Sequence, residues 1–394
     1  MLSFKWHVRI LSGKAIKVAN ALRSMGNTLR GIPPRLVRRA VIACILPVVY
    51  FAAENWWPGR SRINNYNRVI SNRVEGHISL LHRVVSNSAR AILPVYKTTP
   101  ILALHRESGL CPPDIELNSK LKQSIVRIHR LDLRHPLRKR ADWVIKKVRH
   151  ISRFARWMLN QPTTEFIDPL INPPWTVTET YFKSIKRVSR PPTSLTGGIP
   201  LQDLIVYTDG SRMESELNPR VGCGIIIYQA GRVLLRKSIP LNPELTAFDA
   251  EVMAATSAIK LAIPLSTARF SNNLWILLDN LDVARRLLTT PVCSSQGAFI
   301  QFAKIAQEWP NRLRLPHTIP GEVKIHWVPG HSGILGNIEA DRAAKLAQTL
   351  EHPEKSELSL ASARISLKNS KLLALKTYWN EKSPQSYRDL YIQY

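Results

Sequence analysis

Cysteine is scarce in this chain, and its four cysteines, Cys44, Cys111, Cys223 and Cys293, lie far apart. They form no Cys-x-x-Cys pair, so the sequence contains neither a zinc knuckle nor a disulfide framework. This usage is typical of a reducing compartment. We therefore expect an intracellular protein, nuclear or cytoplasmic.

No apolar run is expected to span a bilayer. The strongest candidate, residues 41–53, is too short to span a bilayer and contains Pro47. We expect this stretch to form a buried helix and predict no association with a membrane. The sequence also gives no reason to expect an obligate protein partner.

Acidic residues are few. The chain holds 28 Asp and Glu against 56 Lys and Arg, which gives a formal net charge of +28. Residues 1–150 carry 28 basic and 7 acidic side chains, whereas residues 201–350 carry 15 and 13. A strongly basic N-terminal region indicates a polyanionic partner, such as nucleic-acid phosphates. The alternative is a basic surface that binds nothing specific.

The pattern of apolar residues and prolines predicts four parts. Residues 1–145 are expected to be mostly helical, with helices over 15–29, 35–53, 68–92 and 117–131 and a turn-rich piece over 97–113. Residues 146–200 are expected to be a Pro-rich linker, with seven prolines between 162 and 200. An α/β domain follows over 201–350, and a helical tail over 351–394.

The α/β part alternates short apolar runs with helical patterns. Strands are expected over 204–207, 221–228, 232–240, 274–278 and 323–328, and Gln229-Ala230-Gly231 is a hairpin signal. Helices are expected over 246–263, 280–288, 299–309 and 338–350. This order predicts a mixed five-stranded sheet flanked by helices.

Acidic residues stand where such a sheet could gather them in one cleft. Asp209 follows the first strand, Asp279 ends the fourth, Glu251 lies inside the first helix, and Asp341 falls in the first turn of the last helix, where an anion is tolerated. Carboxylates brought this close resist ionising unless cations bind. Mg²⁺ suits such ligands, and two ions about 3.5–4 Å apart would support hydrolysis of a phosphodiester.

Short motifs surround these acids along the chain, namely Thr208-Asp209-Gly210-Ser211, Ala250-Glu251, Leu278-Asp279-Asn280, Gly330-His331-Ser332-Gly333 and Gly336-Asn337 followed by Ala340-Asp341. Each motif is weak alone, but all of them in order, in matching strand and helix context, are jointly specific. Together they resemble type 1 ribonuclease H over about residues 200–350.

The resemblance implies an endoribonuclease that cuts the RNA strand of RNA–DNA hybrids with two Mg²⁺ ions, for which Mn²⁺ can substitute. By this resemblance Asp209 would bridge both ions, and Asp341 would complete the site of the ion on the nucleophile side. Glu251 and Asp279 would hold the other ion, with Glu251 also near the ribose 2′-OH. His331, on a Gly-rich loop, would assist proton transfer or product release. The residues that would contact the substrate are Gly210, Ser211 and Asn280.

Each of these residues also has a simpler interpretation. Asp209 could be a turn residue, Glu251 a surface acid, Asp279 a helix N-cap and His331 an ordinary loop histidine. Two other functions stay open at this point. One is a catalytically silent relic that still binds nucleic acid, and the other is a metal-dependent exonuclease of the same fold.

The N-terminal region contains a second set of motifs, namely the run 46–57, Tyr96-Lys97-Thr98-Thr99-Pro100, Glu107-Ser108-Gly109-Leu110 and His135-Pro136-Leu137. These motifs resemble the segment that follows the polymerase palm in non-LTR, LINE-like retrotransposon reverse transcriptases. In that family the segment is a thumb-like helical region that holds the template–primer. The alternative is an unrelated helical domain.

The resemblance implies the C-terminal part of a retrotransposon polyprotein. The chain has no Asp-Asp pair, which a polymerase site of this family would need, so we expect no DNA synthesis. Cellular ribonucleases H often carry an extra basic loop before the last strand, and retroelement forms often lack it. Here a single helical stretch, 299–309, stands at that place, so the N-terminal region would have to supply phosphate contacts.

Overall fold

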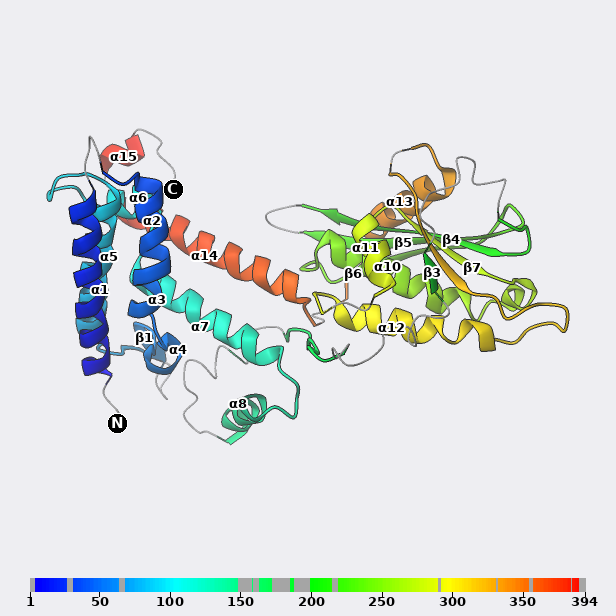
Figure 1. Cartoon of the computed structure of the whole chain (residues 1–394), viewed down its shortest axis with the longest axis horizontal. Helices are drawn as coiled ribbons and strands as arrows, with labels where there is room; N and C mark the ends of the chain where they lie inside the picture. Colours follow the sequence, from blue (N-terminus) through cyan, green and yellow to red (C-terminus); the bar gives the residue numbers. More distant parts are fainter. Residues whose placement is uncertain are drawn as a thin grey trace. The chain divides into compact units, whose positions relative to one another are not determined.

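The computed structural model describes residues 4–26, 31–63, 68–147, 158, 163–171, 185–187, 199–214, 219–289, 292–330, 332–353, 357–383 and 385–389. The chain divides into two compact units. One comprises Met1–Ile128, Pro136–Gln161 and Ile365–Tyr394, and the other His129–His135 and Pro162–Arg364. Below, these are called the helical unit and the α/β unit (Figure 1).

The helical unit is built on the basic N-terminal region. Its elements are α1 (Lys5–Met25), α2 (Pro34–Ala40), α3 (Leu46–Val49), α4 (Ala53–Trp56), β1 (Ser61–Ile63), β2 (Val69–Ser71), α5 (Glu75–Ile92), α6 (Ile101–Ser108), α7 (Pro113–His129), α8 (Pro136–Lys147) and α15 (Gln385–Asp389). The helix α14 (Leu360–Lys382) contributes its residues from Ile365 onward. Helix α1 packs on α5, and Val8, Leu81 and Val85 lie in their shared core.

Several expectations for this region were wrong in detail. The predicted helix over 68–92 begins only at Glu75, because residues 69–71 pair with 61–63 as a two-stranded antiparallel sheet. The predicted turn-rich piece contains helix α6, which ends at Gly109 in the left-handed conformation. The helix has only eight residues and is flanked by turn residues on both sides, so the sequence pattern did not reveal it.

The apolar stretch around Pro47 forms part of one largely helical run, Pro34–Trp56, interrupted by a π-helical turn at Val41–Ile45 and by a turn over residues 50–52, where Ala52 is left-handed. Proline lacks the backbone N–H that an α-helix needs, and the wider turn just before it accommodates this loss. The expectation that this stretch is too short to span a bilayer was therefore wrong: by length and composition the run could cross a membrane, although the core helix of a soluble protein passes the same test. Val41 and Ile45 are fully buried in the core of the helical unit.

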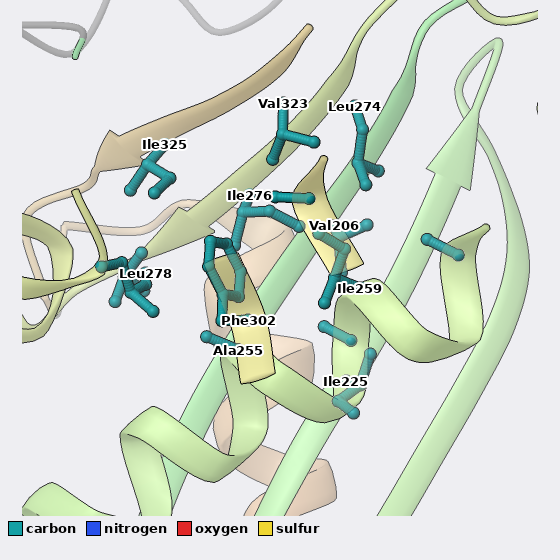
Figure 2. Packing of buried hydrophobic residues seen from close by; sticks show 14 of the residues in the cluster. Val206, Ile225, Ala255, Ile259, Leu274, Ile276, Leu278, Phe302, Val323 and Ile325 are labelled. Carbon is teal, nitrogen blue, oxygen red and sulfur yellow. The ribbon is translucent and has the colours of Figure 1, made fainter. Parts of the chain in front are cut away.

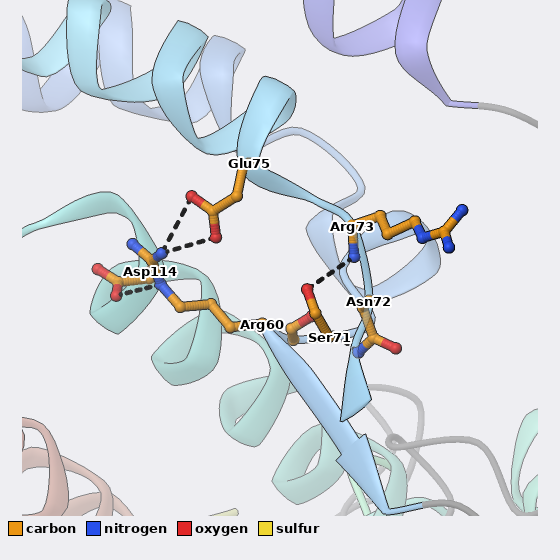
Figure 3. A network of polar contacts seen from close by, with 7 residues as sticks. Arg60, Ser71, Asn72, Arg73, Glu75 and Asp114 are labelled. Carbon is orange, nitrogen blue, oxygen red and sulfur yellow. Dashed lines mark hydrogen bonds and ion pairs between the residues drawn. The ribbon is translucent and has the colours of Figure 1, made fainter. Parts of the chain in front are cut away.

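An arginine joins three elements of the helical unit. Arg60 Nε donates to Asp114 Oδ2 at 2.9 Å, and Arg60 Nη1 donates to Glu75 Oε1 at 3.0 Å (Figure 3). Glu75 and Asp114 lie in the first turns of α5 and α7, where acids are favourable. This network therefore connects the first turns of α5 and α7 to the residue that precedes β1.

The α/β unit contains one mixed sheet in the order β3-β8-β7-β4-β5-β6. Its strands are β3 (Ile185–Arg187), β4 (Leu204–Met213), β5 (Arg220–Gln229), β6 (Arg232–Leu241), β7 (Leu274–Leu278) and β8 (Val323–Trp327). Strands β3, β8, β7 and β4 run parallel, and β5 and β6 are antiparallel additions. The predicted mixed five-stranded sheet is confirmed. One further edge strand, β3, comes from the segment expected to be a linker.

Helices cover both faces of this sheet. They are α10 (Ala247–Ala262), α11 (Leu281–Leu287), α12 (Gln296–Ala306) and α13 (Leu335–Ala347), with 3₁₀ turns at Ser266–Phe270 and Trp309–Asn311. Val206, Ile276 and Phe302 belong to the main core under α10 and α12 (Figure 2). Tyr207 and Leu277, one residue along, point to the opposite face, which α13 covers. This alternation is the period of two that a strand requires.

Candidate functional site

The first acidic residue, Asp209, lies inside a strand and not after it. Strand β4 runs for ten residues to Met213, so the expected short strand over 204–207 was too brief. The polar sequence Thr208-Asp209-Gly210-Ser211 suggested a turn, but each of these residues pairs with β5. Asp209 is 7% exposed. The turn interpretation of Asp209 is therefore wrong, and the carboxylate is fixed by the middle of the sheet.

Gly210 allows helix α10 to approach this point. A Cβ atom at Gly210 would lie 2.3 Å from the backbone nitrogen of Glu251, so no other residue fits without moving the helix. The helix begins with a capping box, in which Thr246 and Asp249 exchange hydrogen bonds. Glu251 follows in the second turn and is also 7% exposed. The surface interpretation of Glu251 is wrong as well.

Helix α13 brings Asp341 to the same end of the sheet. A Cβ atom at Gly224, the partner of Asp209 on β5, would lie 2.1 Å from the carbonyl oxygen of Ala340. Asp341 is the seventh residue of α13, so its predicted place in the first turn was wrong and the helix N-terminus does not favour its charge. Its Oδ2 instead accepts a hydrogen bond from Lys345 Nζ at 2.7 Å.

Asp279 directly follows β7, as expected. Its carbonyl oxygen accepts a hydrogen bond from Trp327 Nε1 at 2.8 Å, and its Oδ2 accepts one from Asn337 Nδ2 at 3.3 Å. Asn280 is the N-cap of α11, and its Oδ1 accepts from the N–H groups of Asp282 and Val283. Because Asn280 caps the helix, Asp279 is left to face the other acids.

The structure brings three of the predicted acids into one group. Ligand oxygens of Asp209, Glu251 and Asp279 all lie within 4.8 Å of one another. Burial, together with the charges of Asp279 and Asp341, raises the pKa of Asp209 from 3.8 to about 7. Burial and the charges of Asp209 and Asp279 raise the pKa of Glu251 well above its usual value. The group therefore resists holding its full negative charge by itself.

A divalent cation fits this group. Glu251 Oε2 is buried and has no hydrogen-bond partner among the described residues. Burying an oxygen without a partner costs free energy unless another group, such as a cation, binds it. The metal-ligand atoms that these three residues offer are all carboxylate oxygens, the hard ligands that Mg²⁺ prefers. Asp341 stands outside the group in its pair with Lys345, yet it is near enough to raise the pKa of Asp209.

The remaining predicted residues have different outcomes. Ser211 Oγ accepts a hydrogen bond from Gln348 Nε2 at 2.8 Å, so its hydroxyl already has a structural partner. Gly210 lacks a side chain and so allows α10 to pack closely on β4, and Asn280 caps α11. Contacts of these three residues with substrate stay predictions. His331 lies outside the described residues, and its role also stays a prediction.

Two residues at the site had no role assigned from sequence. Asn337 orients Asp279, and Lys345 holds Asp341. Lys345 could have been found from its spacing, because residues four apart on a helix form ion pairs. Asn337 stands inside the motif that carries the resemblance, but nothing in the sequence shows which acid it reaches.

Comparison with known proteins gives the family of this unit. Residues 201–349 match the family model of RNase H. This segment is therefore an RNase H domain, and the predicted enzyme class, a ribonuclease H, is confirmed for it. No curated protein matches the chain.

Solved structures resemble the chain at low identity. LC11-RNase H1, isolated from compost by a metagenomic approach, is 21% identical with a TM-score of 0.29, over 37% of this chain and 96% of its own. RNase H1 from the archaeon Halobacterium salinarum is 16% identical with a TM-score of 0.28, over the same shares. A foamy viral protease-reverse transcriptase is 19% identical with a TM-score of 0.31, over 54% of this chain and 28% of its own.

Proposed function

We propose that the RNase H domain hydrolyses the RNA strand of RNA–DNA hybrids internally, with two Mg²⁺ ions as cofactors. The observation that carries this proposal is the convergence of Asp209, Glu251 and Asp279 within 4.8 Å, with one oxygen of Glu251 buried and unmatched. The family match supports the reaction class. Mn²⁺ is expected to substitute for Mg²⁺, since it also binds oxygen ligands.

Each acid of the site would have its own role in holding the two ions. Asp209, Glu251 and Asp279 would together hold one ion, and Asp209 would also contribute to the position of the second. Asp341 would leave Lys345 and complete the other position. When bound, the ions supply Lewis-acid chemistry, activating water and offsetting charge on the leaving oxygen. Asn337 would keep Asp279 oriented through its hydrogen bond.

The experiment is cleavage of a hybrid with the RNA strand labelled at one end. An endonuclease gives a ladder of internal products, whereas an exonuclease shortens the strand from one end. Glu251→Gln keeps the size of the side chain and removes its charge. It should abolish cleavage and leave hybrid binding within about threefold. Cleavage retained in a folded Glu251→Gln variant would remove the support for this site.

We further propose that the helical unit binds nucleic-acid phosphates and derives, with the RNase H domain, from a non-LTR retrotransposon reverse transcriptase. The support is the set of sequence motifs in residues 46–137 and the charge of α1. That helix has no acidic residue, and its exposed basic side chains are Lys5, Arg9, Lys14, Lys17 and Arg23. Arg9 also lies over the exposed ring of Trp6. Basic side chains with an aromatic ring suit a nucleic-acid backbone and a base.

A further inference from the structure

Another buried acid stands close to the metal site but faces away from it. Asp249 is 1% exposed and lies in the first turn of α10, two residues before Glu251. Residues two apart on a helix point about 200° apart, since each residue turns the helix by about 100°. Asp249 therefore lies behind Glu251 and cannot join the carboxylate group of the metal site.

Hydroxyl groups surround Asp249 from three parts of the chain. Its Oδ1 accepts from Ser295 Oγ at the start of α12. Its Oδ2 accepts from Ser359 Oγ at 2.7 Å and from Ser362 Oγ at 2.9 Å, both at the start of α14, and from Thr246 in its own capping box. All these donors are uncharged, so the buried carboxyl group of Asp249 is held by directed hydrogen bonds from hydroxyl groups and from the N–H of Thr246.

The segment that carries Ser359 and Ser362 is held firmly. Leu358 forms a parallel bridge with Thr164, and Glu165 accepts a hydrogen bond from the N–H of Leu360 at 2.7 Å. Glu165 also accepts from Ser294 Oγ and from the N–H of Ser295. Residues 163–168 and 357–362 are therefore attached to the RNase H domain where α10 and α12 begin. Both segments lie outside residues 201–349, which match the family.

The first turn of α10 is thus held from two sides. On one side the serines bind Asp249, and on the other side Gly210 abuts the backbone of Ala250 and Glu251. A shift of this turn away from the serines would move Glu251 with it, because both acids belong to the same rigid helix. A displacement of about 1 Å at a catalytic group can reduce rate about 100-fold.

We propose that Asp249 is a positioning residue for Glu251. In this proposal the hydrogen bonds from Ser359 and Ser362 to Asp249 keep the start of α10, and with it Glu251, in place at the RNase H site. This proposal rests on the proposed function of the acidic site. It assigns a role in metal binding to a segment beyond the matched domain. A nuclease cut at residue 349 would lack this support.

The test measures Mn²⁺ binding to the full chain by electron paramagnetic resonance, together with the Mg²⁺ dependence of hybrid cleavage. The Ser359→Ala/Ser362→Ala variant should weaken Mn²⁺ binding about tenfold, the range seen when groups that orient metal ligands are removed. The value of kcat should fall, and the KM for hybrid should stay unchanged. If this variant unfolds by circular dichroism, Ser362→Ala alone should still weaken Mn²⁺ binding about threefold.

The matched control is Ser294→Ala. Ser294 holds the same segment through Glu165 and the N–H of Ala361, whereas the hydroxyl donors to Asp249 in the described residues are Thr246, Ser295, Ser359 and Ser362. We expect a lower melting temperature with unchanged Mn²⁺ affinity. Equal loss of Mn²⁺ affinity in both variants, or none in the alanine pair, would overturn the positioning role. A wild-type chain that binds Mn²⁺ but cuts no hybrid would refute the proposed reaction alone, and the Mn²⁺ measurement would still decide the role of Asp249.

Discussion

Asp209 should destabilise the metal-free chain, and Asp209→Asn should reverse this. The pKa of Asp209 is raised from 3.8 to about 7, so the native state binds a proton more tightly than the unfolded state. Stability is therefore lost as the pH rises from about 4 to about 7. At 1.36 kcal/mol per pKa unit, the full penalty is about 4 kcal/mol. Asparagine cannot ionise, so it should restore up to this amount at pH 8 and almost nothing at pH 4.

The assay is hydrogen–deuterium exchange of peptides from β4 and α10 in a chelator, comparing wild type with Asp209→Asn at each pH. Comparison at equal pH removes the dependence of intrinsic exchange on pH. Exchange in the variant should be slower at pH 8, and the difference should shrink toward pH 4. Excess Mg²⁺ should slow exchange in wild type and leave the variant almost unchanged. Equal protection of both chains at pH 8 without metal would refute the electrostatic reasoning.

Three further outcomes follow from single contacts. Gly210→Ala should lower the free energy of unfolding by more than about 3 kcal/mol and remove activity, because the added Cβ would lie 2.3 Å from the backbone nitrogen of Glu251. An unchanged melting temperature would contradict this. Lys345→Ala should lower the Mg²⁺ concentration for half-maximal cleavage about twofold, since Lys345 pairs with Asp341; a higher requirement would mean that the lysine helps to place the acid. Lys14→Glu/Lys17→Glu on α1 should reduce the slope of log affinity against log salt by about two, and an unchanged slope would exclude α1 from hybrid binding.

The sequence was sufficient for most of the α/β unit because its elements have strong local signals. The hairpin at Ala230-Gly231 requires two residues with positive φ, and both have it. Strand β7 begins and ends where its apolar run does, and Thr246 caps α10 at the predicted start.

The errors arose where tertiary contacts outweigh local preference. Asp209 and Gly210 look like turn residues, yet pairing with β5 keeps them in a strand. The start of α13 at Leu335 lies in a Gly-rich stretch, and the close approach of Gly336 to the ring of Tyr207 selects a small residue there. The docking of residues 163–168 and 357–362 depends on hydrogen bonds between segments almost 200 positions apart, which no local pattern reveals.

The central claim is that Asp209 holds metal for hybrid hydrolysis. The most direct test is Mg²⁺-dependent cleavage of a labelled RNA–DNA hybrid by wild type and by Asp209→Asn, with binding of the same hybrid measured in parallel. We predict internal cuts in the RNA strand by wild type, a loss of several orders of magnitude in the variant, and similar binding by both. Cleavage by a folded Asp209→Asn chain, or none by a wild type that binds the hybrid, would contradict the claim.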